Sequence, residues 1–285
     1  MIDRAADDRI ERILRATGGD TIALTKWPTE EQPRGILLAV HGYGDYGPST
    51  FEDAAQEWRG QGLAVYAYDQ RGFGRNPSRG IWPGAGRLID DLAQVFAIIQ
   101  SENPGIPITV VGHSMGGAVV TAALGEARIA PTRAILLAPA LWGGPHLSFG
   151  YRALAGVATT FFPDRRWSGD GVVRIQATDN IDALRKLARD PVYLRKPSSR
   201  EFSGLIALMD RAVETAPNVT VPVLTIYGAK DEVVPEDPLR ETTALFAGPK
   251  EFRRIDTGWH LLLRDLEGGI VRDAVAAYAL DGPHG

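Results

Sequence analysis

The sequence VVGHSMGGAVV at residues 110–120 places Ser114 among Gly112, Gly116 and Gly117. Two interpretations account for a serine at the end of an apolar run. The first is a helix N-cap, whose side-chain oxygen accepts a hydrogen bond from the first helical turn. The second is a nucleophile elbow, a sharp strand-to-helix turn that holds a serine hydroxyl exposed above a sheet. Glycines on both sides favour the elbow, because the chain passes close to itself there.

The segments around Ser114 also favour the elbow. ITVVGHS (108–114) is short, apolar and β-branched, as a buried strand should be. MGGAVVTAALGEA (115–127) then begins a helical stretch of small residues. A strand, a sharp turn and a helix in this order form the context that the motif requires.

The composition excludes several classes of protein. The chain has 285 residues, no cysteine and a net charge of −4, so disulfides, thiolate catalysis and cysteine-bound zinc are excluded. Nucleic acid is not expected as a partner, since nucleic-acid-binding surfaces are basic. The charged N-terminal segment lacks the apolar stretch of a signal peptide, and no run approaches the ~20 apolar residues of a membrane span. We expect a soluble cytoplasmic protein, whose oligomeric state the sequence does not indicate.

Apolar runs alternate with helical patterns along most of the chain. Residues 10–26 predict a β-hairpin with its turn at Gly18–Asp20. The further apolar runs are 36–42, 63–69, 108–114, 134–139, 223–228 and 252–258, and the helical patterns are 51–61, 86–102, 115–127, 236–247 and 266–280. This alternation predicts an α/β fold, with a mostly parallel central sheet of about eight strands flanked by helices.

Residues 140–215 interrupt the alternation, because they contain only helical pieces separated by Pro and Gly. The stretch follows one predicted strand and precedes another, so we expect a helical cap, or lid, over the strand ends. The core domain is then expected to comprise residues 1–139 and 216–285. Ligands of such sheets bind outside the carboxyl ends of the strands, where Ser114 lies.

A serine hydroxyl needs a base to take its proton and a third group to orient that base. Among the five histidines, His260 in TGWHLLL is the one in a loop after the last predicted strand. The alternative is a histidine that is satisfied structurally in that loop. His113 adjoins Ser114 and is expected to point away from it along the strand. The remaining histidines are His41, His146 and His284.

Asp231 in YGAKDEVVP (227–235) is the candidate for the third group, since it follows an apolar strand and precedes His260 in the chain. Its alternative role is to form a turn or to cap a helix. Asp231 is preferred because it lies nearest to the end of the strand. The rival carboxylates are Glu232 and Asp237, while Asp256 and Asp265 fit less well.

Attack on a carbonyl also needs two N–H donors for the oxyanion, each contributing about 3 kcal/mol. Met115, at the N-terminus of the predicted helix, supplies one candidate backbone N–H. Tyr43, in the glycine-rich loop HGYGDYG (41–47), supplies the other. Such a loop also suggests phosphate binding, but this one lacks the GxGxxG spacing and a Walker-type lysine.

With these residues identified, the chain resembles the α/β-hydrolase superfamily, and within it the monoacylglycerol lipase and lysophospholipase group. The resemblance covers almost the whole chain and runs in order through HGYGDYG, YDQRGFGRN (68–76), GHSMGG, GAKDEVVP and WHLL. It implies that Ser114 is the nucleophile, Asp231 the acid and His260 the base, with Tyr43 and Met115 as the oxyanion donors. The loop with Asp69, Arg71 and Gly72 is expected to be structural. Relatives with an aspartate nucleophile are disfavoured by the serine.

The predicted cap opens with LSFGYRALAGVATTFFP (147–163), a largely apolar segment whose only charged residue is Arg152. One interpretation is that this face packs on the main domain. The other is that it shelters an acyl chain and touches a lipid surface; both hold if one face docks and the other lines a tunnel. The residues expected to bind substrate are Leu147, Tyr151, Leu154 and Phe161, which recur at helical spacing, together with His113.

The sequence therefore predicts a serine ester hydrolase that works through an acyl-enzyme and needs no metal or organic cofactor. The resemblance implies monoacylglycerols or lysophospholipid-type esters as substrates. The apolar segment of the cap further predicts transient contact with a lipid surface, which would make the protein peripheral at the membrane. Alternatives in the same fold are a small-ester carboxylesterase, a thioesterase, an acyltransferase, a C–C bond hydrolase and a proline-type aminopeptidase. Outside the enzymes, the alternative is a non-catalytic ligand-binding module.

Overall fold

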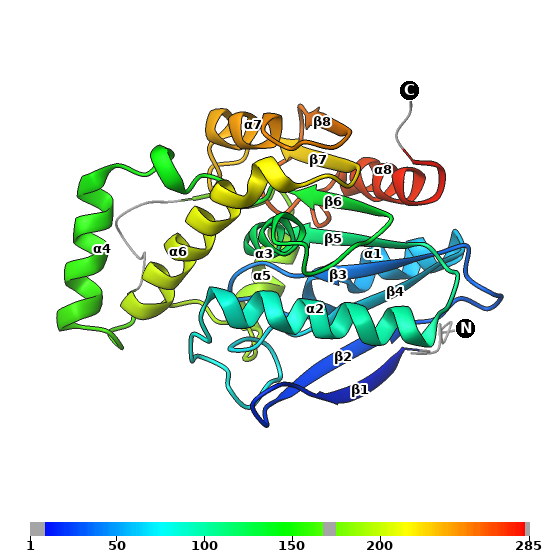
Figure 1. Ribbon diagram of the computed structural model, residues 1–285, viewed down its shortest axis with the longest axis horizontal. Helices are drawn as coiled ribbons and strands as arrows, with labels where there is room; N and C mark the ends of the chain where they lie inside the picture. Colours follow the sequence, from blue (N-terminus) through cyan, green and yellow to red (C-terminus); the bar gives the residue numbers. More distant parts are fainter. Residues whose placement is uncertain (1–8, 168–174, 283–285) are drawn as a thin grey trace.

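The computed structural model describes residues 9–167 and 175–282. This part of the chain contains an eight-stranded sheet with the strand order β1-β2-β4-β3-β5-β6-β7-β8 (Figure 1). The strands are β1 Ile10–Arg15, β2 Thr21–Trp27, β3 Gly35–Val40, β4 Leu63–Tyr68, β5 Ile108–His113, β6 Arg133–Leu137, β7 Val223–Gly228 and β8 Lys250–Ile255. The predicted α/β fold is confirmed, including the number of strands.

The sheet is parallel from β3 to β8, and β1 and β2 form an antiparallel hairpin at one edge. The hairpin turns through Gly18 and Gly19, whose φ angles of 87° and 86° favour glycine. Strands β3, β4, β5 and β7 are buried at every residue. Burial on both faces explains why these strands are near-continuous apolar runs in the sequence rather than alternating ones.

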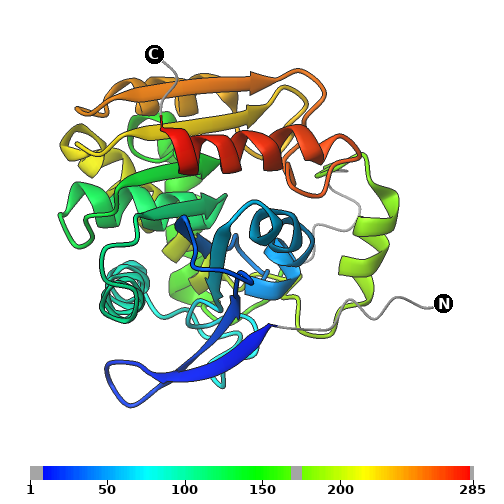
Figure 2. The same cartoon turned by 90° about the vertical axis from the view of Figure 1, so that its right-hand side faces the viewer.

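Helices cover both faces of the sheet (Figures 1 and 2). α1 Gly47–Gly60 and α8 Gly268–Asp281 pack on one face, where Trp58 and Val275 belong to the same apolar core. α2 Ala85–Glu102, α3 Met115–Gly125 and α7 Glu236–Ala244 contribute to the core of the other face. With both faces covered, the carboxyl ends of the parallel strands are the edge left open to a ligand.

Between β6 and β7 the described chain is helical, as predicted. Its elements are η1 Gly144–His146, α4 Phe149–Phe161, α5 Ile181–Arg189, α6 Ser199–Thr215 and η2 Ala216–Asn218. Helix α6 starts with a capping box between Ser198 and Glu201 and packs along α3. Helix α4 instead stands away from the sheet, at the left of Figure 1. Within the two described ranges, no helix is long and apolar enough to span a bilayer.

Strand β8 ends three residues earlier than the run 252–258 predicted. The chain leaves the sheet after Ile255 in a turn, in which the N–H of Gly258 donates to the carbonyl of Ile255 at 3.1 Å. Gly258 lies against Gly228 at the end of β7, too close for a side chain on Gly228. The turn directs the following loop, which carries His260, over the ends of the strands.

Candidate active site

Ser114 lies in the turn between β5 and α3, with φ 51° and ψ −118°. This backbone conformation is strained for a residue other than glycine. The side chain makes no capping hydrogen bond to α3, so Ser114 does not act as an ordinary N-cap. The turn is fixed by the Ser114 N–H, which donates to the carbonyl of Leu137 on β6 at 3.0 Å. This geometry is that of a nucleophile elbow.

The three glycines around Ser114 are required by close approaches of the backbone. A Cβ on Gly112 would overlap Gly116 and Gly117, and one on Gly116 would overlap the carbonyl of Val40 on β3. A Cβ on Gly117 would overlap Pro139, just after β6. The elbow is therefore packed against both neighbouring strands at distances that exclude side chains.

The structure brings Ser114, His260 and Asp231 together from three separate loops. Oγ of Ser114 lies 3.1 Å from Nε2 of His260, and Nδ1 of His260 lies 2.8 Å from Oδ2 of Asp231. The side chain of Asp231 is fully buried and that of His260 is 8% exposed. The Nδ1–H of a neutral imidazole donates to the carboxylate, which leaves Nε2 free to accept the Ser114 proton. The three side chains can thus act as nucleophile, base and orienting acid.

The other carboxylates considered for the acid role have different partners. Glu232 accepts a hydrogen bond from the Gln176 N–H at 2.7 Å, and Asp256 pairs with Arg254. Asp265 accepts from the Thr178 hydroxyl at 2.6 Å and from the Trp259 N–H at 2.7 Å. Asp231 is held in place by the N–H groups of the residues that follow it, because its Oδ1 accepts from Val233 and Val234. 

Tyr43 and Met115, the predicted oxyanion donors, both line the cavity that contains Ser114 and His260. Met115 is the first residue of α3, where backbone N–H groups are free of intrahelical partners. The side chain of Tyr43 points elsewhere, since its hydroxyl donates to the Glu201 carboxylate at 3.0 Å and its ring packs edge-on against Phe73. The hydrogen bond to Glu201 holds the loop of Tyr43 against α6.

The cavity around Ser114 has a volume of about 480 Å³ and a mainly apolar lining. The lining residues that the sequence analysis missed are Ala140, Trp142, Ala177, Leu184, Leu187, Ala188, Tyr193, Arg195, Leu205 and Met209 from the stretch between β6 and β7, with Asp45, Val233, Val234 and Leu261 from other loops. The signal for α5 was its amphipathic spacing, which presents Leu184, Leu187 and Ala188 on one side. An acyl chain fits such a lining, because burial of its methylenes is favourable.

Three of the residues expected to bind substrate lie elsewhere in the structure. Leu147 is buried in the main core, and Leu154 and Phe161 on α4 are 67% and 70% exposed. None of the three is among the residues that line the catalytic cavity. Leu154 and Phe161 share helix α4 as their spacing predicted, whereas Leu147 precedes that helix. Because α4 stands away from the strand ends, residues of α5 and α6 line the cavity instead. The side chain of Tyr151 lies outside the described part of the structure.

His113 does line the cavity, and it also contacts the loop of the base. Its Nε2–H donates to the carbonyl oxygen of His260 at 3.0 Å, and the two ring centroids are 5.2 Å apart. Burial, reinforced by the neighbouring His260, lowers the pKa of His113 to about 3. His113 is therefore neutral at physiological pH and faces His260 as a hydrogen-bond donor.

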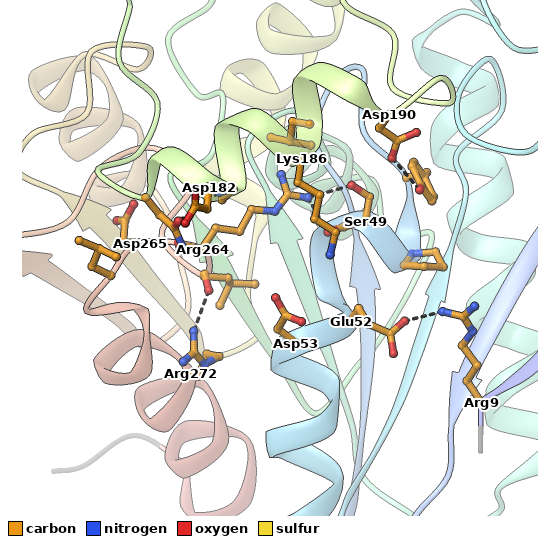
Figure 3. Close-up of a pocket in the computed structure, with 17 residues that line it drawn as sticks. Arg9, Ser49, Glu52, Asp53, Asp182, Lys186, Asp190, Arg264, Asp265 and Arg272 are labelled. Carbon is orange, nitrogen blue, oxygen red and sulfur yellow. Dashed lines mark hydrogen bonds and ion pairs between the residues drawn. The ribbon is translucent and has the colours of Figure 1, made fainter. Parts of the chain in front are cut away.

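A second, polar groove of about 570 Å³ lies on the other side of α5 (Figure 3). Most of its charged side chains have polar partners. Arg9 forms an ion pair with Glu52 at 2.7 Å, and the guanidinium of Arg264 donates to the hydroxyl of Ser49. Leu187 lines both this groove and the catalytic cavity. Helix α5 thus separates an apolar catalytic cavity from a charged outer groove.

This fold, with its elbow serine followed in the chain by Asp231 and then His260 in hydrogen-bonding order, is that of the α/β-hydrolase class. A family model described as serine aminopeptidase, S33, matches residues 31–267. The chain therefore belongs to this family of serine hydrolases. The loop with Asp69 and Arg71 is structural here: Asp69 accepts from the Gly47 N–H, and Arg71 pairs with buried Asp91.

Several proteins that are similar to this chain are named monoacylglycerol or monoglyceride lipases. The chain is 26% identical over 276 residues to a monoacylglycerol lipase of Mycolicibacterium smegmatis, covering 95% of this chain and 96% of that protein. It is 25% identical over 211 residues to the human monoglyceride lipase, covering 73% and 68%. A soluble variant of the Saccharomyces cerevisiae monoglyceride lipase, solved with a substrate analog, has a TM-score of 0.83 at 18% identity and covers 99% of this chain and 98% of that one.

Proposed function

We propose that this protein hydrolyses carboxylic esters of lipids, with monoacylglycerols or lysophospholipid-type esters as substrates. The observation that carries the proposal is the hydroxyl of Ser114, hydrogen-bonded to the buried His260–Asp231 pair inside an apolar cavity of about 480 Å³. The names of the relatives support the same class of substrate. 

The reaction proceeds in two acyl transfers. His260 takes the Ser114 proton as Oγ attacks the ester carbonyl, and the backbone N–H groups of Tyr43 and Met115 donate to the resulting oxyanion. His260 then gives the proton to the leaving alcohol, which departs as an acyl-enzyme forms. A water molecule deprotonated by His260 releases the acid and restores Ser114. Asp231 stays ionised and stabilises the imidazolium.

The cavity favours an ester over a peptide substrate. An aminopeptidase needs an unpaired carboxylate for the substrate amino group. Among the described residues that line the cavity, the one carboxylic acid is Asp45, and it is paired with Arg264 at 2.7 Å. The remaining lining is largely apolar, which suits an acyl chain.

Residues 140–215 form the cap in this proposal, and 1–139 with 216–285 form the core domain. Helix α5 and α6 cover the acyl chain, while α4 carries an outer face for a lipid surface. That face holds Leu154, Val157 and Phe161, all more than half exposed, with Phe162 directly after the helix. A row of large apolar side chains in water is otherwise unfavourable.

The test measures hydrolysis of p-nitrophenyl acyl esters and labelling by a fluorophosphonate probe. Ser114→Ala should abolish both while the thermal melting temperature stays near that of the wild type. Ser101→Ala, which changes an exposed serine of α2, is the matched control and should retain both. Hydrolysis that survives Ser114→Ala would falsify the proposal. A fall in kcat/KM from acetyl to decanoyl esters would instead identify a small-ester carboxylesterase.

A further inference from the structure

A small cavity adjoins His113 behind the elbow. Its volume is about 10 Å³, and its lining residues are Thr50, His113, Leu261, Leu263 and Arg264. Three of these residues carry a buried polar atom without a hydrogen-bond partner in the described protein: Thr50 Oγ1, His113 Nδ1 and Arg264 Nη1. Buried polar atoms nearly always have a partner. Three such atoms around one cavity indicate that something polar binds between them.

We propose that one water molecule binds in this cavity, links Arg264 to His113 and so makes His113 a positioning residue for His260. A volume of about 10–15 Å³ is what one water needs, and two to four polar partners are typical of a buried water. The guanidinium of Arg264 disfavours a cation, and the small volume excludes a polyatomic anion. The catalytic part of this inference rests on the proposed function, whereas the binding of the water does not.

The donors and acceptors around the cavity balance for one water. The Nη1–H of Arg264 can only donate, so the water oxygen accepts from it. The Nε2–H of His113 donates to the carbonyl of His260, so the unprotonated Nδ1 of His113 accepts a hydrogen bond from one O–H of the water. The other O–H of the water donates to Oγ1 of Thr50. Each of the three atoms is then satisfied.

This water completes a chain of contacts that ends at the base. Asp45 and the Ser49 carbonyl accept from Nη2 of Arg264 at 2.7 and 2.5 Å, which fixes the guanidinium. The water fixes the Nε2–H tautomer of His113, and Nε2–H then holds the main chain of His260. Thr50 and His113 are 7% and 4% exposed, so the chain is shielded from solvent. It aligns the imidazole of His260 with Ser114 without contacting the substrate's reacting atoms.

Two structural measurements test the water directly. A high-resolution crystal structure should show an ordered water within hydrogen-bonding distance of all three atoms, and a dry cavity would overturn the inference. Nitrogen-15 NMR of histidine-labelled protein should show His113 protonated at Nε2 and bare at Nδ1 from about pH 5 to about pH 9. Protonation at Nδ1, or titration near the ordinary value, would contradict it.

Kinetics test the positioning role. His113→Leu removes the donor to His260 and should lower kcat about tenfold, the rate equivalent of one hydrogen bond, with little change in KM. His113→Gln retains an N–H donor and should recover most of this loss. Equal losses in the two variants would show that His113 acts through packing alone.

A milder pair of variants remains informative if His113→Leu does not fold. Thr50→Val removes one partner of the water, so it should displace the crystallographic water and lower kcat severalfold. Thr225→Val is the matched control, because Thr225 on β7 has a buried hydroxyl that is also unpartnered in the described structure but does not line this cavity. Equal kcat values for the two variants would overturn the inference. If Ser114→Ala remains active, the proposed function fails, while the crystal structure and the NMR spectrum still decide on the water.

Discussion

The hydroxyl of Thr178 donates a hydrogen bond of 2.6 Å to Oδ1 of Asp265 and so joins the segment before α5 to the loop of His260. The other oxygen of Asp265 accepts from the N–H of Trp259, the residue before His260, at 2.7 Å. A second link lies beside it, because the Leu261 N–H donates to the Ala177 carbonyl at 2.8 Å. The helical stretch between β6 and β7 is therefore tied to the main chain on both sides of His260.

Thr178→Val should weaken this link. The change leaves the buried Oδ1 of Asp265 without its partner, which costs about 1–3 kcal/mol in the free energy of unfolding. Because Asp265 also holds Trp259, we expect a severalfold lower kcat as well. Urea denaturation and ester hydrolysis measure the two effects. Thr225→Val serves as the control, and a loss of stability of the same size in both variants would contradict the specific role of Thr178.

Asp231→Asn tests which carboxylate orients the base. An amide can donate to Nδ1 of His260 and hold the wrong tautomer, so we expect kcat to fall about 10⁴-fold, as in other serine hydrolases with this change. Glu232→Gln alters the neighbouring carboxylate, which binds the Gln176 N–H instead, and should leave kcat within about threefold of the wild type. If the larger loss followed Glu232→Gln, the assignment of the acid would be wrong.

The strand ends and the elbow were predictable because their signals are local. Strand β5, the turn at Ser114 and the start of α3 are contiguous in the sequence, so the strand, the turn and the helix can be recognised together. Of the glycines there, Gly112 reflects a contact within the motif, whereas Gly116 and Gly117 contact Val40 and Pro139 outside it. Asp231 and His260 were predictable for a related reason, since each follows a strand of a parallel sheet. The topology of such a sheet brings those loops to one edge.

The cavity lining was less predictable because it depends on how the helices between β6 and β7 dock. The spacing of Leu154 and Phe161 predicts an apolar face on α4, but spacing does not say what the face contacts. Helix α5 is short and carries many charged residues, so its amphipathic spacing gives little sign of a cavity lining. In the structure its Leu184 and Leu187 nevertheless line the cavity. The role of His113 was also hidden, since its partner is the backbone of a residue 147 positions away.

Arg71 and Arg128 provide a matched pair of ion pairs for testing the structural role of the loop after β4. Arg71 binds both oxygens of Asp91 at 2.8 and 2.9 Å, with both side chains nearly fully buried. Arg71→Met leaves a buried unpaired carboxylate and should cost about 3–5 kcal/mol of stability. Arg128 pairs with Asp90 at the surface, so Arg128→Met should cost less than about 1 kcal/mol. Equal costs in denaturation experiments would contradict the buried role.

The buried histidines predict how stability depends on pH. Burial lowers the pKa of His113 to about 3 and lowers that of His41 from its ordinary value of 6.5. Below pH 6.5 the unfolded chain therefore binds protons that the folded protein does not. The free energy of unfolding should be highest above pH 6.5 and fall below it, by about 1.4 kcal/mol per pH unit for each histidine.

Urea denaturation between about pH 7.5 and about pH 5 measures this slope. His113→Gln should reduce the slope of the free energy of unfolding against pH by the contribution of one histidine, about 1.4 kcal/mol per pH unit. This change in slope is expected whatever the effect of the variant on stability at neutral pH. A slope that is unchanged in the variant would show that His113 is not the buried neutral group described here.

The exposed face of α4 leads to a prediction about membranes that is separate from catalysis. Burying a large apolar side chain in a lipid interface is worth about 1.5 kcal/mol, or roughly tenfold in binding. Leu154→Ser and Phe161→Ser should each weaken binding to phosphatidylcholine vesicles by about that factor, and kcat/KM for a dissolved short-chain ester should stay unchanged because neither side chain lines the catalytic cavity. Ile13→Ser is the control, since Ile13 is also exposed, at 68%, but lies on the edge strand β1 rather than on α4. Equal losses of vesicle binding for Ile13→Ser and Phe161→Ser would mean that α4 is no special lipid contact, and its apolar face would then need another partner.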